Sequence, residues 1–306
     1  MDDMVARLAL LAARHSHEGL TPTPIANLGL IRVNRPCDLL PEVYRPVVSL
    51  IVQGEKELTI GSQVLTYRAG DTFTTALDLP VRARITRASP DKPYLAISLT
   101  IDIASVLDLA SLSLDTDSAA SEQGFGVHRA GTDLLGAYDR ALCLFDRSGD
   151  AVVMASMLER ELLYRLLAGS QGAALNRLAT GERHVAQIRS ALDLIGRTYK
   201  EPFSAKEIAQ TVGMSVSALH RRFKAATGMA PLQYQKTLRL YEARRLLLEN
   251  SVSASSVAFT VGYESASQFT REYRRMFDAP PARDARNMTS GWSHDGGSHQ
   301  PSCQSR

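Results

Sequence analysis

The spacing of hydrophobic residues changes along the chain. Between Val47 and Leu99, apolar and polar positions alternate in short runs separated by turn residues, a pattern typical of β-strands. Gly61-Ser62 predicts a two-residue hairpin turn, and Ala69-Gly70-Asp71 predicts a second turn. The runs are VVSLIV, ELTI, QVLTY, DTFTTA, VRARIT and YLAISL. This region therefore predicts a compact β-barrel or sandwich.

Helical spacing flanks the strand-rich region. Met4 to Arg14 predicts a short amphipathic helix, and from Leu134 onward apolar residues recur with the helical period. Ala137 to Arg147 and Val152 to Leu167 are the candidate helices there. The apolar positions of the second candidate are Val153, Met157, Leu158, Leu162, Leu166 and Leu167. They are consistent either with packing against the barrel or with a dimer seam, and both alternatives stay open.

Length and composition suggest two domains. A chain of 306 residues is about twice the usual ~150-residue domain. A stretch rich in Gly, Ala and Ser predicts a linker at 169–182. The polar segment 289–306 contains almost no aliphatic residues and predicts a disordered tail.

Charge is distributed unevenly between the two parts. Arg183 to Thr289 contains 17 Lys or Arg and 9 Asp or Glu, a net charge of +8, whereas the remainder of the chain carries −5. A basic segment joined to an acidic one suggests a module that binds a polyanion.

The basic part contains an internal repeat. FSAKEIAQTVG, from Phe203 to Gly213, aligns with VSASSVAFTVG, from Val252 to Gly262, at an offset of 49 residues. Beyond the glycine the offset becomes 50, so the second copy has one more residue in its turn. We conclude that one supersecondary unit is present twice.

Each copy has the pattern of a helix-turn-helix. In the first copy, Ser204 and Glu207 form a capping box, and Gly213 ends the helix in a left-handed turn. Leu219, Phe223 and Ala226 then predict a buried stripe on the next helix, and in the second copy Phe269, Tyr273 and Phe277 do so. In the second copy Ser253 caps the helix and Gly262 ends it.

These residues resemble the AraC/XylS family of bacterial transcription regulators. The resemblance covers Ile188 to Arg286 and is carried by VGMSVSALHRRFKAATGMAPLQY, KTLRLYEARRLLL and VGYESASQFTREYRRMF. SLIVQGEKELTIG, LDLPVRARITRASPDKPYLAISL and ERELLYRLL are similar to the N-terminal domain of one branch of the family. The resemblance implies an α+β protein, with a cupin-like β-barrel and helices followed by two helix-turn-helix units joined by a long helix.

The resemblance also implies a domain order. We expect an N-terminal arm at 1–20, a sensing or dimerisation domain at 21–168 and a DNA-binding domain at 183–288. Within the last, the helix-turn-helix units are expected at 204–227 and 253–277. Pro231 predicts the start of the joining helix, whose length suits two reading helices in adjacent major grooves.

The side chains opposite the two buried stripes are the candidate DNA contacts. They are Ser217, His220, Arg221, Lys224, Ser267, Gln268, Thr270, Arg271, Arg274 and Arg275. We expect Arg271 to reach a base or a phosphate, and Arg274 or Arg275 to reach a phosphate.

The second copy departs from the pattern at two positions. Asp278 stands where the first copy has Gly228, and Asp284 stands where it has Tyr234. We expect both changes to weaken helix ends locally more than they affect DNA binding.

Enzymatic patterns are absent from the sequence. None of the seven histidines falls between Val47 and Leu99, so a metal-dependent cupin enzyme is not expected. The sequence has no G-x-S-x-G elbow and no Gly-Lys for a P-loop. The three cysteines are far apart and fit neither a disulfide framework nor a zinc site. We expect no catalytic residue, metal or cofactor; the alternative is a barrel-based enzyme tethered to DNA.

The expected partner is double-stranded promoter DNA, and the resemblance adds RNA polymerase. A small-molecule effector with unassigned contact residues and a homodimer stay open, as does the choice between an activator and a repressor. The apolar run Leu8 to Ala13 is too short to span a bilayer. We therefore expect a cytoplasmic protein with no membrane partner.

Overall fold

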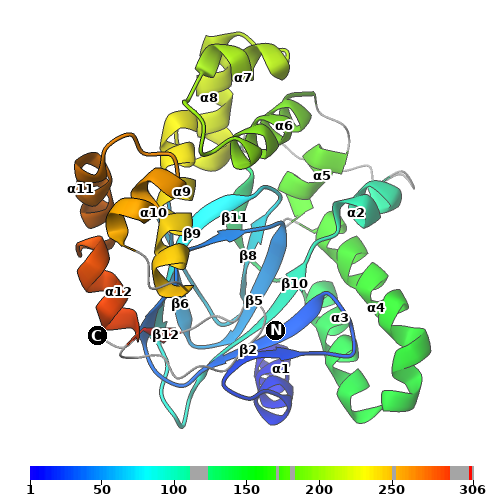
Figure 1. The fold of residues 1–306 in the computed structure, drawn as a ribbon. Coiled ribbons are helices and arrows are strands. Elements are labelled where there is room, and N and C mark those ends of the chain that lie inside the picture. The colour runs from blue at the N-terminus through cyan, green and yellow to red at the C-terminus, as the bar shows by residue number, and fades with distance from the viewer. Residues whose placement is uncertain (111–122, 170–171, 180–182, 250–252, 290–302, 305–306) are drawn as a thin grey trace. The chain divides into compact units, whose positions relative to one another are not determined.

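The computed structural model describes residues 1–110, 123–169, 172–179, 183–249, 253–289 and 303–304 (Figure 1). The chain divides into two compact units. The first is built mainly from Met1–Ala186 and is called the N-terminal domain; the second is built mainly from residues after Gln187 and is called the C-terminal domain. The expected disordered tail, 289–306, falls largely on residues outside the described part; its described residues 303–304 form the short strand β12 (Cys303–Gln304).

Two antiparallel sheets form the N-terminal domain. One has the order β1-β2-β10-β5-β8-β11, and the other contains β3-β9-β6-β7 with β4 also paired to β9. The strands are β1 (Gly19–Pro22), β2 (Leu28–Val33), β3 (Cys37–Leu39), β4 (Glu42–Tyr44), β5 (Val47–Gln53), β6 (Glu55–Ile60), β7 (Gln63–Arg68), β8 (Asp71–Thr75), β9 (Leu79–Arg87), β10 (Tyr94–Thr100) and β11 (Phe125–Arg129). The strand order does not close into a ring, so the fold is a cupin-like open sandwich and not a closed barrel.

The six strand runs of the sequence are β5 to β10. The predicted hairpin joins β6 to β7, with Ile60 opposite Gln63 and Gly61 at φ 60°. The alternating pattern did not reveal β1 to β4 or β11; of these, β3 and β4 have only three residues each, too few to show a period. Cys37 on β3 is disulfide-bonded and Cys143 is free, so the cysteines of this domain do not form a framework of several disulfides.

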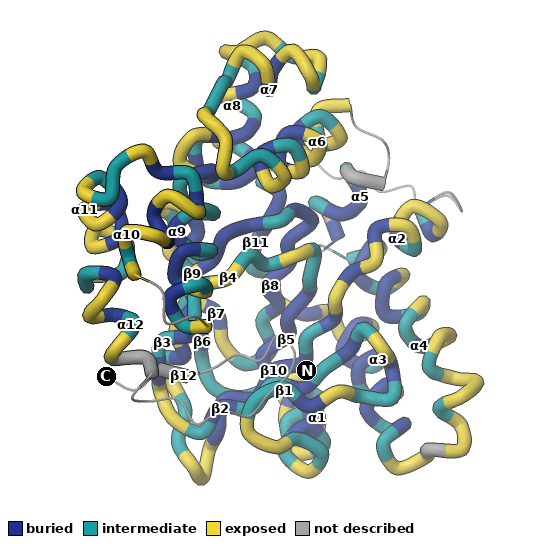
Figure 2. Tube along the Cα trace, in the orientation of Figure 1, coloured by how far each residue is buried: buried dark blue, intermediate teal, exposed yellow. Residues whose placement is uncertain are grey.

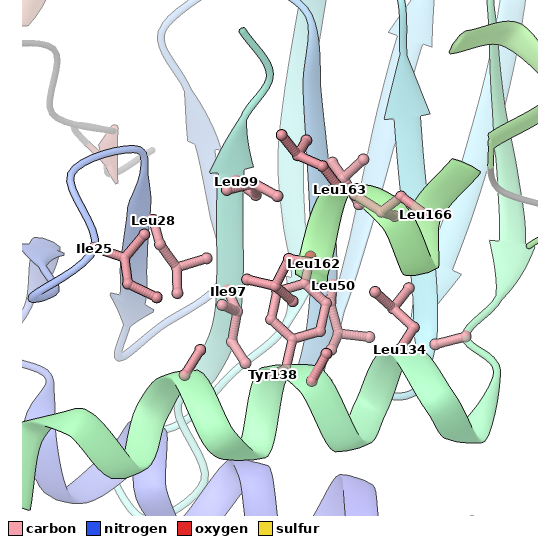
Figure 3. Close-up of a cluster of buried hydrophobic side chains, with 14 of the residues drawn as sticks. Ile25, Leu28, Leu50, Ile97, Leu99, Leu134, Tyr138, Leu162, Leu163 and Leu166 are labelled. Atoms are coloured by element: carbon pink, nitrogen blue, oxygen red, sulfur yellow. The ribbon is translucent and has the colours of Figure 1, made fainter. Parts of the chain in front are cut away.

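Helices cover the outer face of the first sheet, where the main core lies. They are α1 (Asp2–His15), α2 (Ile103–Ala110), α3 (Thr132–Leu142), the 3₁₀ turn η1 (Cys143–Asp146), α4 (Ser148–Ala168) and α5 (Ala173–Ala179). Figure 3 shows Leu50 and Ile97 of the sheet close to Tyr138 of α3 and Leu162 of α4. Burial of these apolar side chains stabilises the domain.

Three details differ from the helix predictions. The expected helix at 137–147 begins earlier, at Thr132, and tightens into η1. Val153 and Met157 are 66% and 59% exposed, so only the leucines of that stripe pack in the core. Part of the expected linker is α5, because Leu175 is buried and the Asn176 side chain donates to the carbonyl oxygen of Leu167 at 2.7 Å.

The C-terminal domain is helical. Its helices are α6 (Arg183–Arg197), α7 (Ala205–Thr211), α8 (Val216–Thr227), α9 (Pro231–Glu249), α10 (Ala254–Thr260), α11 (Ala266–Phe277) and α12 (Pro281–Thr289). The starts of α7 and α10 differ by 49 residues and those of α8 and α11 by 50, which confirms the repeat and its longer second turn.

The turns of the repeat use the expected residues. Ser204 and Ser253 accept backbone N–H bonds from Glu207 and Ser256 at the starts of α7 and α10. Gly213 and Gly262 end these helices with φ values of 67° and 91°, in the left-handed region where glycine has no Cβ penalty. The sequence therefore specifies both helix-turn-helix units locally.

Candidate nucleic-acid interface

One face of α8 carries the first set of candidate DNA contacts. Ser217, His220, Arg221 and Lys224 are all exposed. Figure 2 shows exposed and buried segments following one another in the region of α7 and α8. Leu219 and Phe223, on the opposite face, are fully buried. The Ser215 side chain accepts the Ala218 N–H at 3.2 Å at the start of this helix. Burial of Leu219 and Phe223 therefore fixes the rotation of α8 and turns the candidate DNA contacts toward solvent.

The equivalent face of α11 carries the second set. Ser267, Thr270, Arg271, Arg274 and Arg275 are exposed. Together with Ala266 they line an open hollow of about 740 Å³ on the surface. Basic side chains around a hollow on a capped helix suit a polyanion.

Gln268 differs from the other candidates. It is half-buried, and its side-chain amide donates to Oε1 of Glu272 at 3.3 Å. The structure thus places nine candidates on exposed positions and this one beside a buried carboxylate. Gln268 would have to leave that carboxylate to reach DNA.

A charge cluster fixes α11 to α9. Glu272 is buried and accepts hydrogen bonds from the Lys236 ammonium at 2.7 Å and from the Tyr263 hydroxyl at 2.9 Å. Burial alone would raise the pKa of Glu272, but the hydrogen bonds from Lys236, Gln268 and Tyr263 outweigh it and lower that pKa. The carboxylate therefore remains charged at neutral pH and keeps its partners.

A second buried cluster joins α9, α11 and α12. The Arg244 guanidinium donates to both carboxylate oxygens of Asp284, at 2.9 and 3.2 Å, and the Tyr273 hydroxyl donates to the same carboxylate at 2.7 Å. All three residues are buried. Asp284 is thus a central packing contact, which corrects the expectation that it weakens a helix end.

The first repeat has an aromatic contact at the positions equivalent to Tyr273 and Asp284. There Phe223 packs edge-to-face on Tyr234, with ring centroids 5.5 Å apart. The second repeat replaces this aromatic pair by the Tyr273–Asp284 hydrogen bond. Asp278 ends α11 at φ 58°, so the left-handed turn is kept without glycine. Phe277, expected to be buried, is half-buried beside Tyr273.

Two side chains that the sequence did not single out hold the turns of the repeat. Arg239 of α9 donates to the carbonyl oxygens of Tyr199, Glu201 and Gly262 at 2.6, 2.6 and 2.7 Å. Gln187 of α6 donates to those of Val212 and Gly213, both at 2.9 Å. Each helix-turn-helix is therefore anchored by the helix that precedes it, a long-range pairing that periodicity does not reveal.

The helix α9 separates the two reading helices. It begins at Pro231, as expected, and runs for 19 residues to Glu249. At ~1.5 Å per residue this is a rod of about 28 Å.

The described part of the chain contains no cluster of three or more histidine, cysteine, aspartate or glutamate side chains that could hold a metal ion. No helix among the described residues is long and apolar enough to cross a membrane.

Comparison with known proteins identifies both halves of the chain. Residues 24–174 match the family described as the AraC-type transcriptional regulator N-terminus, and residues 208–287 match a helix-turn-helix domain family. Both matches fall where the sandwich and the repeat lie.

Among curated relatives, the HTH-type transcriptional regulator ArgR of Pseudomonas aeruginosa is 31% identical over 158 residues, covering 51% of this chain and 47% of that protein. The HTH-type transcriptional activator RhaS of Salmonella agona is 30% identical over 144 residues, covering 47% of this chain and 51% of that protein. The chain thus spans about half the length of these curated relatives.

ToxT from Vibrio cholerae O395 is a similar solved structure. It has a TM-score of 0.50 and 10% sequence identity, and covers 85% of this chain and 96% of its own. This similarity concerns the fold alone.

Proposed function

Since the chain belongs to the AraC/XylS family, we propose that it is a sequence-specific DNA-binding regulator of transcription. One observation carries the proposal. Two capped helices, α8 and α11, present equivalent exposed polar and basic faces at an offset of 50 residues, and both are anchored to α9. A single such helix is a common feature, whereas a matched pair on one rod suits two successive turns of DNA.

The proposed binding mode follows from these faces. Arg221 on α8 and Arg271 on α11 are the candidates for base contacts, and Lys224, Arg274 and Arg275 for phosphate contacts. Arginine suits guanine because its fork can donate two hydrogen bonds to one base edge. The phosphate contacts supply affinity that falls steeply with salt concentration.

The N-terminal domain has the proposed role of sensing a small molecule or of dimerisation. Promoter DNA is the proposed principal partner, RNA polymerase the proposed second, and a homodimer is compatible with the exposed Val153 and Met157 of α4. ArgR and RhaS are both named as regulators of transcription and not as enzymes, which argues against a DNA-tethered enzyme. A cytoplasmic location is part of the proposal, because a regulator of transcription needs access to promoter DNA.

Replacing Arg221 or Arg271 by alanine should weaken binding to the specific site by about 1–3 kcal/mol if the arginine reads a base. Both side chains are exposed, so the melting temperature should stay near that of the wild type. Fluorescence anisotropy with specific and scrambled duplexes measures the effect. Arg87→Ala, an exposed change on β9, is the control and should bind normally. Normal operator binding by both recognition-helix variants would refute their assignment.

Deletion of residues 1–180 should leave a fragment that folds and binds DNA. The fragment keeps Ile188, Leu192 and Ile195, the buried face of α6, as well as both charge clusters of the C-terminal domain. Circular dichroism should show helix with a cooperative melt, and any effector response should be lost. A fragment without a cooperative transition would contradict an independent C-terminal domain.

A further inference from the structure

The inner face of the first sheet carries polar side chains. Val48 and Leu50 of β5 pack in the core beneath the helices, so Ser49 between them points to the opposite face. By the same alternation, Leu95 of β10 faces the helices and Tyr94 faces inward. Phe73 of β8 lies directly opposite Ser49 in the strand register and shares its face.

The second sheet contributes the other half of this inner cluster. In β6 the residues Lys56, Leu58 and Ile60 are buried, and the intervening ones are not. Lys56 is paired with Tyr67 of β7 in the register. The ring of Tyr67 lies 6.0 Å from that of Phe73 on the first sheet. The inner cluster, defined as Tyr44, Ser49, Lys56, Tyr67, Phe73 and Tyr94, therefore draws on both sheets.

Lys56 is the unusual member of the inner cluster. It is 4% exposed, and every other lysine of the described chain is less buried. Its ammonium donates to the Tyr44 hydroxyl at 2.8 Å and lies 5.4 Å from the Tyr44 ring centre. Burial lowers the pKa of Lys56 to about 8, although Glu42 opposes the shift. An ammonium has three donors, and within the described residues one of them is satisfied.

Three hydroxyl groups of the inner cluster are buried and make no hydrogen bond of normal length and angle among the described residues. They are the Tyr67 and Tyr94 hydroxyls and the Ser49 Oγ. Ser49 and Tyr94 nevertheless lie beside the Tyr67 hydroxyl and act on it as hydrogen-bonding neighbours, which lowers the pKa of Tyr67 against the larger opposite effect of burial. Unsatisfied buried polar groups are costly and rare in native proteins. Water can satisfy the hydroxyls, but it carries no charge, and Glu42, the carboxylate that acts on the Lys56 charge, is exposed to solvent.

We infer that the inner cluster binds a small monocarboxylate with an apolar body. The carboxylate would accept hydrogen bonds from the Lys56 ammonium and from the hydroxyls of Tyr67, Tyr94 and Ser49. A single ammonium balances one negative charge, which favours a carboxylate over a phosphate dianion. The rings of Tyr44 and Phe73, with centroids 6.2 Å apart, offer apolar contact for the body of the ligand. This inference rests on the proposed function for its regulatory meaning, since it names the chemical class of the effector.

The first test needs no ligand. A charge held in the interior for binding destabilises the empty protein, so Lys56→Met should raise the melting temperature of the full chain by several degrees. Lys92→Met, the same change at an exposed lysine on a turn, should leave it unchanged. A lower melting temperature for Lys56→Met would show that Lys56 is a structural contact and would overturn the inference.

The second test uses acids and their neutral counterparts. The full chain is titrated calorimetrically with acetate, benzoate, phenylacetate and octanoate, and with the four corresponding amides. At least one acid should bind, and its amide should bind at least about tenfold more weakly. Lys56→Met should lower the affinity of the protein for that acid by about tenfold to a hundredfold. Binding of none of the four acids, equal binding of acid and amide, or unchanged binding by Lys56→Met would each overturn the inference.

The pH dependence gives an independent signature. As the pH rises through about 8, the Lys56 ammonium loses its proton and acid binding should weaken progressively. The groups that face it are Glu42 and Tyr44 on β4, Tyr67 on β7 and Tyr94 on β10; burial raises the pKa of Tyr67 and of Tyr94, so both stay neutral. Constant affinity from pH 7 to 9 would contradict a role for this ammonium.

DNA binding by the same preparation separates the two proposals. If the protein binds its specific DNA and no acid, the inner-cluster inference fails and the proposed function stands. If it binds an acid as described and no DNA sequence specifically, the proposed function fails and the acid site remains.

Discussion

Replacing Asp284 by alanine should destabilise the C-terminal domain by about 3–5 kcal/mol. The change leaves the Arg244 guanidinium buried without its carboxylate and the Tyr273 hydroxyl without its acceptor. Because domains are stable by only about 5–15 kcal/mol in total, much of the second helix-turn-helix would be unfolded at growth temperature. DNA binding should fall with it, although Asp284 lies on the buried side of the unit.

Urea unfolding followed by circular dichroism measures this change. Asp193→Ala, an exposed aspartate on α6, is the matched control and should cost little. The double variant Arg244→Met with Asp284→Leu should recover most of the loss, because apolar residues of similar size often replace a buried ion pair without penalty. A cost below about 1 kcal/mol for Asp284→Ala, the range typical of surface pairs, would contradict the structural role assigned to this pair.

The repeat in the C-terminal domain could be predicted in detail because its signals are local. Serine caps, left-handed glycines and apolar residues three or four positions apart act within one or two turns of helix. They located α7, α8, α10 and α11 and the exposed faces of the reading helices. Local signals of this kind need no knowledge of tertiary contacts.

The contacts that hold the repeat together could not be predicted in this way. Lys236 and Glu272 are 36 positions apart, and Arg244 and Asp284 are 40 apart, so no local pattern relates them. Compared with Tyr234 of the first repeat, Asp284 was expected to weaken the helix end. Its buried contact with the Arg244 guanidinium, which no local pattern shows, explains the aspartate.

In the N-terminal domain, too, features set by local patterns were predicted and those set by tertiary contacts were not. The strands β5 to β10 have five to nine residues and were predicted, whereas β3 and β4 have three residues each, too few to show a period. The α5 helix lies in a stretch whose composition suggested a linker, and burial of Leu175 decides its structure. The inner cluster was not predicted because Lys56 lies on β6 between two glutamates and reads as an exposed strand position until both sheets are assembled.

Inserting five base pairs between the two blocks of the binding site should abolish specific binding. The rod α9 is about 28 Å long, and equivalent major-groove faces of B-DNA recur every ~34 Å, or 10 to 10.5 base pairs. Five base pairs rotate the second block by about half a turn to the far side of the duplex. The contacts that fix α11 on α9 do not permit that rotation without breaking the Lys236–Glu272 and Arg244–Asp284 pairs.

The affinity of the protein for two duplexes tests most directly whether both helix-turn-helix units bind DNA at a fixed spacing. Selection from random DNA supplies the site, and anisotropy titrations compare it with a version carrying five extra central base pairs; a duplex with the same length and a changed central sequence is the control. Two helix-turn-helix units held on one rod should give normal binding to the control and a loss of about a hundredfold or more with the insertion, toward the non-specific level. Equal affinity for the two spacings would show that only one helix-turn-helix engages DNA and would contradict the account.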